Sequence, residues 1–269
     1  MARDPKPTVR TGRNVCYSLA MSSANGRFCF YELRTIDLDA AQRFYQAVFG
    51  ERLRASSCAD GSKSLHLQDV CVGNITMLPP QAIASGAPSH WLGHIGVESV
   101  DAVLPAWLAE GAIQLGPVRR SDAGVAVAPL RDPLGSVVAI TDRTSPAQRQ
   151  FWHELNTKDE ARALALYGQL LGWQATDSFD PGLGIGPYQQ FAWSSDGESV
   201  GGMVSSQRLP GVHPHWLFYF PVDRLDEAMA QVTQLGGDIY HGPRQMPNGA
   251  WVAQCEDPQG AVLGLLQAP

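Results

Sequence analysis

Two glutamates stand at matching places on two strand-like segments, 122 residues apart. Glu32 lies within the run from Phe28 to Thr35, and Glu154 is its equivalent in the second half of the chain. Side chains two residues apart on a strand share a face, so Glu32 points to the same side as Phe30, and Glu154 points to the same side as Trp152. Among apolar neighbours, Glu32 is expected to have a raised pKa and to act as a general acid or base. Both carboxyl groups are therefore candidate catalytic groups.

Imidazoles, a phenol and apolar side chains alternate in the same way on two further segments. His90 and His94 flank Leu92, and 125 residues later His215 and Tyr219 flank Leu217. Such groups, with the aromatic residues beside the glutamates and one arginine, could line a pocket for a small molecule. The candidate ligand-binding residues are Phe30, Arg34, His90, Leu92, His94, Trp152, His215, Leu217 and Tyr219.

Three interpretations of the glutamates stay open. They can bind or transform a ligand, or Glu32 can join His90 or His94 in a divalent metal site, because carboxylates and imidazoles are both metal ligands. Alternatively, each glutamate pairs with a neighbouring cation such as Arg34, or caps backbone N–H groups.

The chain repeats itself. Residues 44–50 match residues 166–172 at a shift of 122, and residues 132–135 match residues 257–260 at a shift of 125. A repeat this long indicates a duplicated domain rather than a solenoid, whose repeats run about 20–50 residues. A length of 269 residues agrees with two domains. The expected division is a flexible leader over 1–25, a first domain over 26–143 and a second over 150–269.

Each half contains two strand–helix–strand units of βαβββ type. In the first unit, Asp37 or Asp39 begins a segment with apolar residues at helical spacing, and Gly50 ends it. The other expected helices span 101–110, 159–171 and 225–235, and the elements that carry the candidate residues are strands over 28–35, 90–97 and the equivalent segments of the second half.

Composition restricts the partners. A net charge of −6 and a pI near 5.6, without a basic cluster, argue against nucleic acid and anionic membranes. Five cysteines without Cys-x-x-Cys spacing indicate reduced thiols in a cytoplasmic protein. We expect a monomer or homodimer whose partner is a small-molecule ligand.

The four units, the Phe-Tyr-x-x-x-Phe-Gly helix end at 44–50 and the two Asp-Pro-x-Gly turns resemble the vicinal oxygen chelate superfamily, which includes glyoxalase I, bleomycin and fosfomycin resistance proteins and extradiol dioxygenases. The resemblance covers about residues 28–267. It implies an α+β fold with tandem glyoxalase-like domains, in which four βαβββ units form curled mixed sheets around a cavity. That cavity usually holds a divalent metal.

The resemblance also implies where the metal ligands should stand, and no such position holds a metal-binding side chain. They fall on Phe30, Leu92 and Ala139 in the first half and on Trp152, Leu217 and Gly264 in the second. A divalent ion needs oxygen, nitrogen or sulfur ligands. We therefore expect no metal and no other cofactor, unless a displaced site has formed.

The sequence is consistent with two functions, a binding protein and an enzyme. The first is a glyoxalase-like protein without the usual metal ligands that binds a small apolar or aromatic molecule in one or both cavities. The second is a glyoxalase-like lyase or isomerase, or a dioxygenase, that uses a displaced metal site or a glutamate base. The exchange of Arg34 for Asn156 and of His94 for Tyr219 indicates that the two pockets have diverged.

Overall fold

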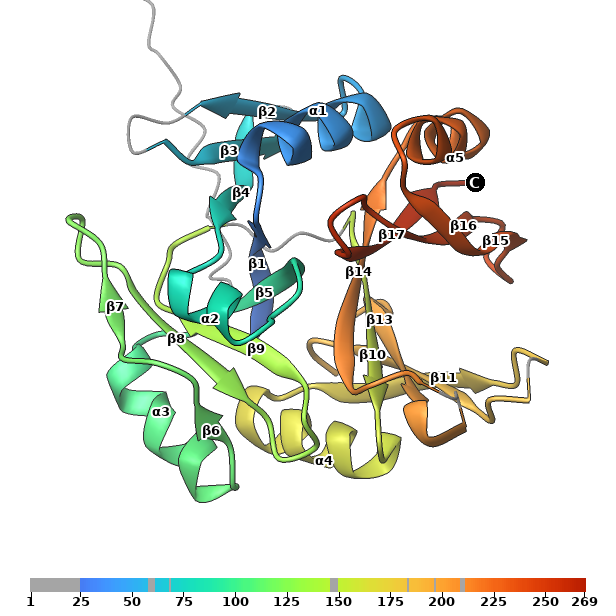
Figure 1. Ribbon diagram of the computed structural model, residues 1–269. Coiled ribbons are helices and arrows are strands. Elements are labelled where there is room, and N and C mark those ends of the chain that lie inside the picture. The colour runs from blue at the N-terminus through green and yellow to red at the C-terminus, as the bar shows by residue number, and fades with distance from the viewer. Residues whose placement is uncertain are drawn as a thin grey trace, which may run out of the picture.

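The computed structural model describes residues 25–57, 61–67, 69–145, 150–182, 184–195, 197–208 and 211–269. Two mixed β-sheets dominate it, one of nine strands and one of eight (Figure 1). Residues 1–24 of the expected leader and residues 146–149 of the expected boundary lie outside the described residues. Among the described residues, no helix is long and apolar enough to cross a membrane.

The first sheet has the strand order β2-β3-β4-β1-β5-β9-β8-β6, and β7 pairs with β8. Its strands are β1 (Arg27–Thr35), β2 (Leu53–Ser57), β3 (Lys63–Leu67), β4 (Val70–Met77), β5 (His90–Gly96), β6 (Ile113–Gln114), β7 (Arg119–Arg120), β8 (Ala126–Arg131) and β9 (Val137–Thr141). The second sheet has the equivalent order β11-β12-β13-β10-β14-β17-β16-β15. Its strands are β10 (Trp152–Thr157), β11 (Gln174–Phe179), β12 (Tyr188–Ala192), β13 (Gly201–Ser205), β14 (His215–Pro221), β15 (Asp238–Gln245), β16 (Trp251–Glu256) and β17 (Val262–Gln267).

Both units of a half join one sheet. β1 pairs with β5, and β10 with β14, in antiparallel fashion. The predicted α+β fold of four βαβββ units in two mixed sheets is confirmed, and both sheets remain open rather than closing into barrels. The halves therefore do not exchange strands.

The helices follow the expected signals. α1 (Leu38–Phe49) begins after Asp37, whose Oδ1 accepts hydrogen bonds from the backbone N–H groups of Asp39 and Ala40. It ends at Gly50, which has a φ of 58°. The remaining helices are α2 (Pro80–Ala84), α3 (Val100–Ala109), α4 (Glu160–Leu171), α5 (Leu225–Gln234) and the short 3₁₀ helix η1 (Ser206–Arg208). The short elements α2, β6 and β7 were not predicted from the sequence.

The two halves share one core across a pseudo-twofold relation. Tyr31 and His153 occupy equivalent positions 122 residues apart, and the Tyr31 hydroxyl lies 2.7 Å from His153 Nε2. The ring of Phe28 stacks on that of His153, with centroids 4.8 Å apart. Gly93 has no room for a side chain, because a Cβ there would lie 2.4 Å from Cζ of Phe218. The inner strands of the two sheets are therefore packed directly against each other.

A reciprocal pair of hydrogen bonds also joins the halves. Tyr45 of α1 donates to Oδ2 of Asp257 (2.8 Å), and its equivalent Tyr167 of α4 donates to Oδ2 of Asp132 (3.0 Å). Each aspartate begins an Asp-Pro-x-Gly turn of the opposite half, and its Oδ1 accepts two backbone N–H groups of that turn. α1 also packs beside α5, as Figure 1 shows. The motifs that mark the repeat thus hold its two copies together.

Candidate functional site

The predicted residues of the first half lie on facing positions of β1 and β5. Phe30 is opposite His94, Glu32 is opposite Leu92, and Arg34 is opposite His90. Leu92 is fully buried and is not among the residues that line the cleft, so its predicted contact with a ligand stays a prediction.

Glu32 is held in a charged cluster. Its carboxylate accepts hydrogen bonds from Arg34 (3.1 and 3.3 Å) and from the Thr76 hydroxyl (2.9 Å), and His94 Nε2 lies 3.2 Å away. Burial alone would raise the pKa of Glu32, but His94 and Arg34 outweigh it and hold that pKa well below its usual range. The expected raised pKa of Glu32 is therefore wrong, and pairing with Arg34 is the interpretation that the structure shows.

His90 does not join this cluster. Its Nδ1 lies 2.9 Å from the carbonyl oxygen of Pro88, and the equivalent His215 makes the same contact with His213 at 2.7 Å. Burial lowers the pKa of both imidazoles. Each of these rings is thus turned toward the backbone just before its own strand.

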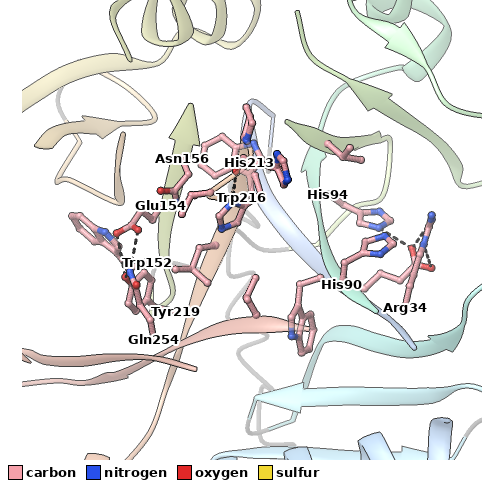
Figure 2. A pocket seen from close by; sticks show the side chains of 18 of the residues that line it. Arg34, His90, His94, Trp152, Glu154, Asn156, His213, Trp216, Tyr219 and Gln254 are labelled. Atoms are coloured by element: carbon pink, nitrogen blue, oxygen red, sulfur yellow. Dashed lines mark hydrogen bonds and ion pairs between the residues drawn. The ribbon is translucent and has the colours of Figure 1, made fainter. Parts of the chain in front are cut away.

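The second half places its residues in the same register. Trp152 is opposite Tyr219, Glu154 is opposite Leu217, and Asn156 is opposite His215. Figure 2 shows Trp152, Glu154, Tyr219 and Gln254 gathered on one side of the pocket, and Arg34, His90 and His94 on the other.

Neutral groups hold Glu154. Its Oε2 accepts hydrogen bonds from the hydroxyls of Tyr188 and Tyr219, each at 3.1 Å, and its Oε1 accepts from Gln254 Nε2 at 3.2 Å. Gln254 also donates to the Tyr219 hydroxyl (2.7 Å), and Trp152 Nε1 donates to that of Tyr188 (2.8 Å). Burial raises the pKa of Glu154, and the hydrogen bonds from the two tyrosines only partly oppose it. The pKa values of the two equivalent glutamates are therefore shifted in opposite directions, down for Glu32 and up for Glu154.

Glycines make room for the two tyrosine rings. A Cβ on Gly202 would lie 2.0 Å from Cε1 of Tyr188, and a Cβ on Gly264 would lie 2.2 Å from Cδ1 of Tyr219. Gly264 is one of the positions where the family resemblance implies a metal ligand. The space that a ligand side chain would enter at this position is filled by the Tyr219 ring.

The residues present do not fit a divalent metal at the family's positions. Those positions hold Phe30, Leu92 and Ala139 in one sheet and Trp152, Leu217 and Gly264 in the other. In the part of the chain that the structure describes, no three His, Cys, Asp or Glu side chains are grouped closely enough to hold a metal ion.

Side chains of both sheets line one cleft of about 2690 Å³. A pocket for one drug-sized ligand measures about 300–1,000 Å³, so the cleft has room for a ligand beside each sheet. We call the part beside Phe30, Glu32 and His94 the first cavity, and the part beside Trp152, Glu154 and Tyr219 the second cavity. His213 and Trp216 lie between them (Figure 2). Further cleft residues, which the sequence did not predict, come from other strands and loops: Asn74, Arg131, Arg143, Tyr188, His213, His241 and Gln254.

The glycine-rich segment over 180–187 leads into β12 and not into a helix, so no helix N-terminus follows it to bind the phosphates of a nucleotide. Asp180, Pro181 and Ile185 line the cleft. Arg244 donates to the carbonyl oxygen of Pro181 at 2.6 Å.

Comparisons with known proteins agree with this architecture. Residues 149–265 match the sequence profile of the Glyoxalase/Bleomycin resistance protein/Dioxygenase superfamily. A Mycobacterium tuberculosis protein named "Putative glyoxylase CFP32" is 28% identical over 248 residues, which cover 88% of this chain and 92% of that protein. The anthracycline biosynthesis protein DauV of a Streptomyces species is 25% identical over 191 residues, or 68% of this chain and 67% of that protein.

Solved structures share the fold at low identity. The Mn(II)-bound glyoxalase from Novosphingobium aromaticivorans has a TM-score of 0.63 and 15% identity, covering 91% of this chain and 83% of that one. The 2,3-dioxygenase LapB from Pseudomonas sp. KL28 has a TM-score of 0.61 and 13% identity, covering 92% and 93%. The second half of the chain therefore matches the glyoxalase/bleomycin resistance protein/dioxygenase superfamily, also called the vicinal oxygen chelate superfamily, and the whole chain shares the fold of its two-domain members.

Proposed function

We propose that this protein binds a small aromatic molecule in the second cavity without using a metal ion. The observation that carries the proposal is the group of neutral donors around Glu154. Tyr188, Tyr219 and Gln254 satisfy this buried carboxyl group. The Tyr219 ring fills the place of one family ligand. A satisfied polar group in a cavity walled by aromatic side chains is typical of a site for an organic ligand.

The second cavity has its own apolar lining, separate from the main core. Leu217, Tyr219 and Val252 form a distinct buried cluster. Four half-buried apolar side chains pack against that cluster: Trp152, Met246, Val262 and Leu266. All seven line the cleft. Their number and the half-exposed Trp152 ring favour a flat apolar ligand, because aromatic faces gain from stacking as well as from burial.

One relative supports the same ligand class. DauV is named for anthracycline biosynthesis. Anthracyclines are planar and polycyclic, and their oxygen substituents could accept or donate hydrogen bonds beside Gln254 and Asn156. For the present chain, we infer only that its ligand has a similar planar shape and similar oxygen substituents.

The uncharged fluorophore N-phenyl-1-naphthylamine tests the proposal. We expect it to bind the purified protein equally well with and without a chelator. Trp152→Ala should weaken binding about tenfold or more, because the substitution removes the main aromatic surface. Phe30→Ala, at the equivalent position of the first cavity, is the matched control and should leave the affinity unchanged.

Two results would contradict the proposal. Binding that requires an added divalent ion would show that a metal is part of the site. An equal loss of fluorophore affinity in Trp152→Ala and Phe30→Ala would show that the fluorophore does not bind selectively in the second cavity.

One observation favours a second candidate function, a lyase or isomerase without a metal. Burial raises the pKa of Glu154 inside a cavity, a combination common among general acids and bases. Turnover of the hemithioacetal of methylglyoxal, abolished in Glu154→Gln while fluorophore binding persists, would establish this function. Ligand binding without turnover would contradict the enzyme and agree with the proposed binding protein.

A further inference from the structure

The two sides of the cleft carry opposite charge. The lining residues from the first half include five arginines and a single acidic residue, Glu32. These arginines are Arg34, Arg119, Arg120, Arg131 and Arg143. The lining residues from the second half include one arginine, Arg244, and four acidic residues. The acidic residues are Glu154, Asp177, Asp180 and Glu198.

Strand alternation places the arginines of the first cavity. Val137 and Arg131 are paired across β9 and β8, and both line the cleft. Arg143 follows β9 at the same parity as Val137. At a shift of 125 residues, Arg131 and Arg143 correspond to Glu256 and Ala268. The excess of cations is thus a property of the first cavity and not of the repeated fold.

Arg143 is the arginine that is poised for a ligand. Its guanidinium carbon lies 4.2 Å from the centroid of the Phe30 ring, which fixes it over the cavity wall. Its Nε is buried without a hydrogen-bond partner, and within the described residues no acidic side chain forms an ion pair with it. By contrast, Arg34 is occupied by Glu32 and Arg120 by Asp101.

Two further buried polar atoms of the first half lack a hydrogen-bond partner among the described residues. In the part of the chain that the structure describes, Nδ1 of His94, a residue only 4% exposed, has no hydrogen-bond partner, and neither has Oδ1 of Asn74. Both residues line the cleft. An unsatisfied buried polar atom costs free energy, so these atoms indicate a missing partner in the first cavity.

We propose that the first cavity is a second, separate ligand site, which binds a small organic acid with its anionic group at Arg143. The apolar part of the acid would lie against Phe30, Val127 and Val137, which line the cleft from strands of the first sheet. Arg119 and Arg131 add positive charge around it and attract anions. Glu32 does not oppose this, because its charge is paired with that of Arg34. The inference concerns another cavity and another ligand class, so it does not rest on the proposed function.

A charged and an uncharged form of one fluorophore test the assignment. The probe is 8-anilinonaphthalene-1-sulfonate, which carries the naphthylamine skeleton of N-phenyl-1-naphthylamine and a sulfonate. We expect Arg143→Gln to weaken sulfonate binding about tenfold or more, as for loss of a charge-assisted contact. Arg143→Lys should retain part of the affinity. Arg162→Gln, which removes an arginine of α4 outside the cleft, is the matched control and should bind as the unaltered protein does.

The two probes separate this proposal from the previous one. Arg143→Gln should leave binding of the uncharged probe intact, which also shows that the variant is folded, and Trp152→Ala should leave binding of the sulfonate intact. Phenylacetate should displace the sulfonate, and phenylacetamide should not. Failure of the sulfonate to bind, wild-type affinity in Arg143→Gln, or equal displacement by acid and amide would each overturn the proposal. Loss of the uncharged probe alone would overturn only the function proposed for the second cavity.

Discussion

Glu32→Gln is expected to lower the free energy of unfolding at pH 7 by about 1–3 kcal/mol, the typical cost of leaving partly buried charged groups without their partner. The substitution leaves Arg34 and His94 without a carboxylate. The folded-state pKa of Glu32 is depressed. The stability that it contributes is therefore present above its unfolded-state pKa, near 4.5, and is lost as the pH falls from there toward the folded-state pKa.

Glu154→Gln is expected to show the opposite pH dependence. The folded-state pKa of Glu154 is raised, because burial disfavours its ionised form. Its favourable contribution is present below the unfolded-state pKa and is lost as the pH rises through the folded-state pKa. The neutral glutamine avoids that loss, so Glu154→Gln should gain stability relative to the unaltered protein as the pH rises.

Urea unfolding of both variants and the unaltered protein at pH 4, 6 and 8 measures these differences. The stability lost in Glu32→Gln should grow from pH 4 to pH 8, whereas the stability lost in Glu154→Gln should shrink or turn into a gain. If the stability change depended on pH in the same way for both variants, the two glutamates would have the same environment. That result would contradict the different hydrogen-bond partners of Glu32 and Glu154.

Phe28→Ala is expected to destabilise the protein by about 3–5 kcal/mol, as for removal of a fully buried aromatic ring. Phe28 is 0% exposed and contacts His153, Trp173, Trp216 and Phe218, all from the other half. Because its contacts cross between the halves, both should still unfold in one transition, at a lower denaturant concentration.

Phe179→Ala is the matched control for this substitution. Phe179 is half-buried and lines the cleft, so its loss should cost much less. Tryptophan fluorescence, which includes Trp173 and Trp216 of the second half, and far-ultraviolet circular dichroism should report coincident transitions. A Phe28→Ala protein whose second half keeps its original midpoint would disprove a shared core.

Local sequence patterns were sufficient for α1, α3, α4, α5 and the strands that carry the two glutamates, but not for the short elements α2, β6 and β7. Asp37 and Gly50 marked the ends of α1, because capping and positive φ depend on residues close in sequence. Alternation along β1 correctly placed Glu32 on one face with Phe30 and Arg34. Alternation along β9, continued to residue 143, would have given Arg143 the same face as Val137, but its contact with Phe30 depends on the order of the strands in the sheet.

The chemistry of the glutamates depended on contacts between distant segments. Tyr188 and Gln254 reach Glu154 from β12 and β16, which lie 34 and 100 residues away in the chain. The glycine at 202 is the one sequence signal for the tyrosine ring, since it leaves the space that the ring fills. The raised pKa of Glu154 comes from burial in the folded chain, and the lowered pKa of Glu32 depends on His94, which is 62 residues away, as well as on Arg34. Neither direction could be assigned from the local sequence.

The most direct test of a metal-independent site is a titration of chelator-treated protein with Mn(II), Ni(II), Zn(II) and Fe(II), followed by calorimetry and by fluorescence of bound N-phenyl-1-naphthylamine. We predict no stoichiometric ion with a Kd below about 1 μM, the tight-binding range of about −8 kcal/mol or better, and unchanged fluorophore affinity. One tightly bound ion per chain, lost in Glu32→Gln or Glu154→Gln, would contradict this prediction and establish a displaced metal site.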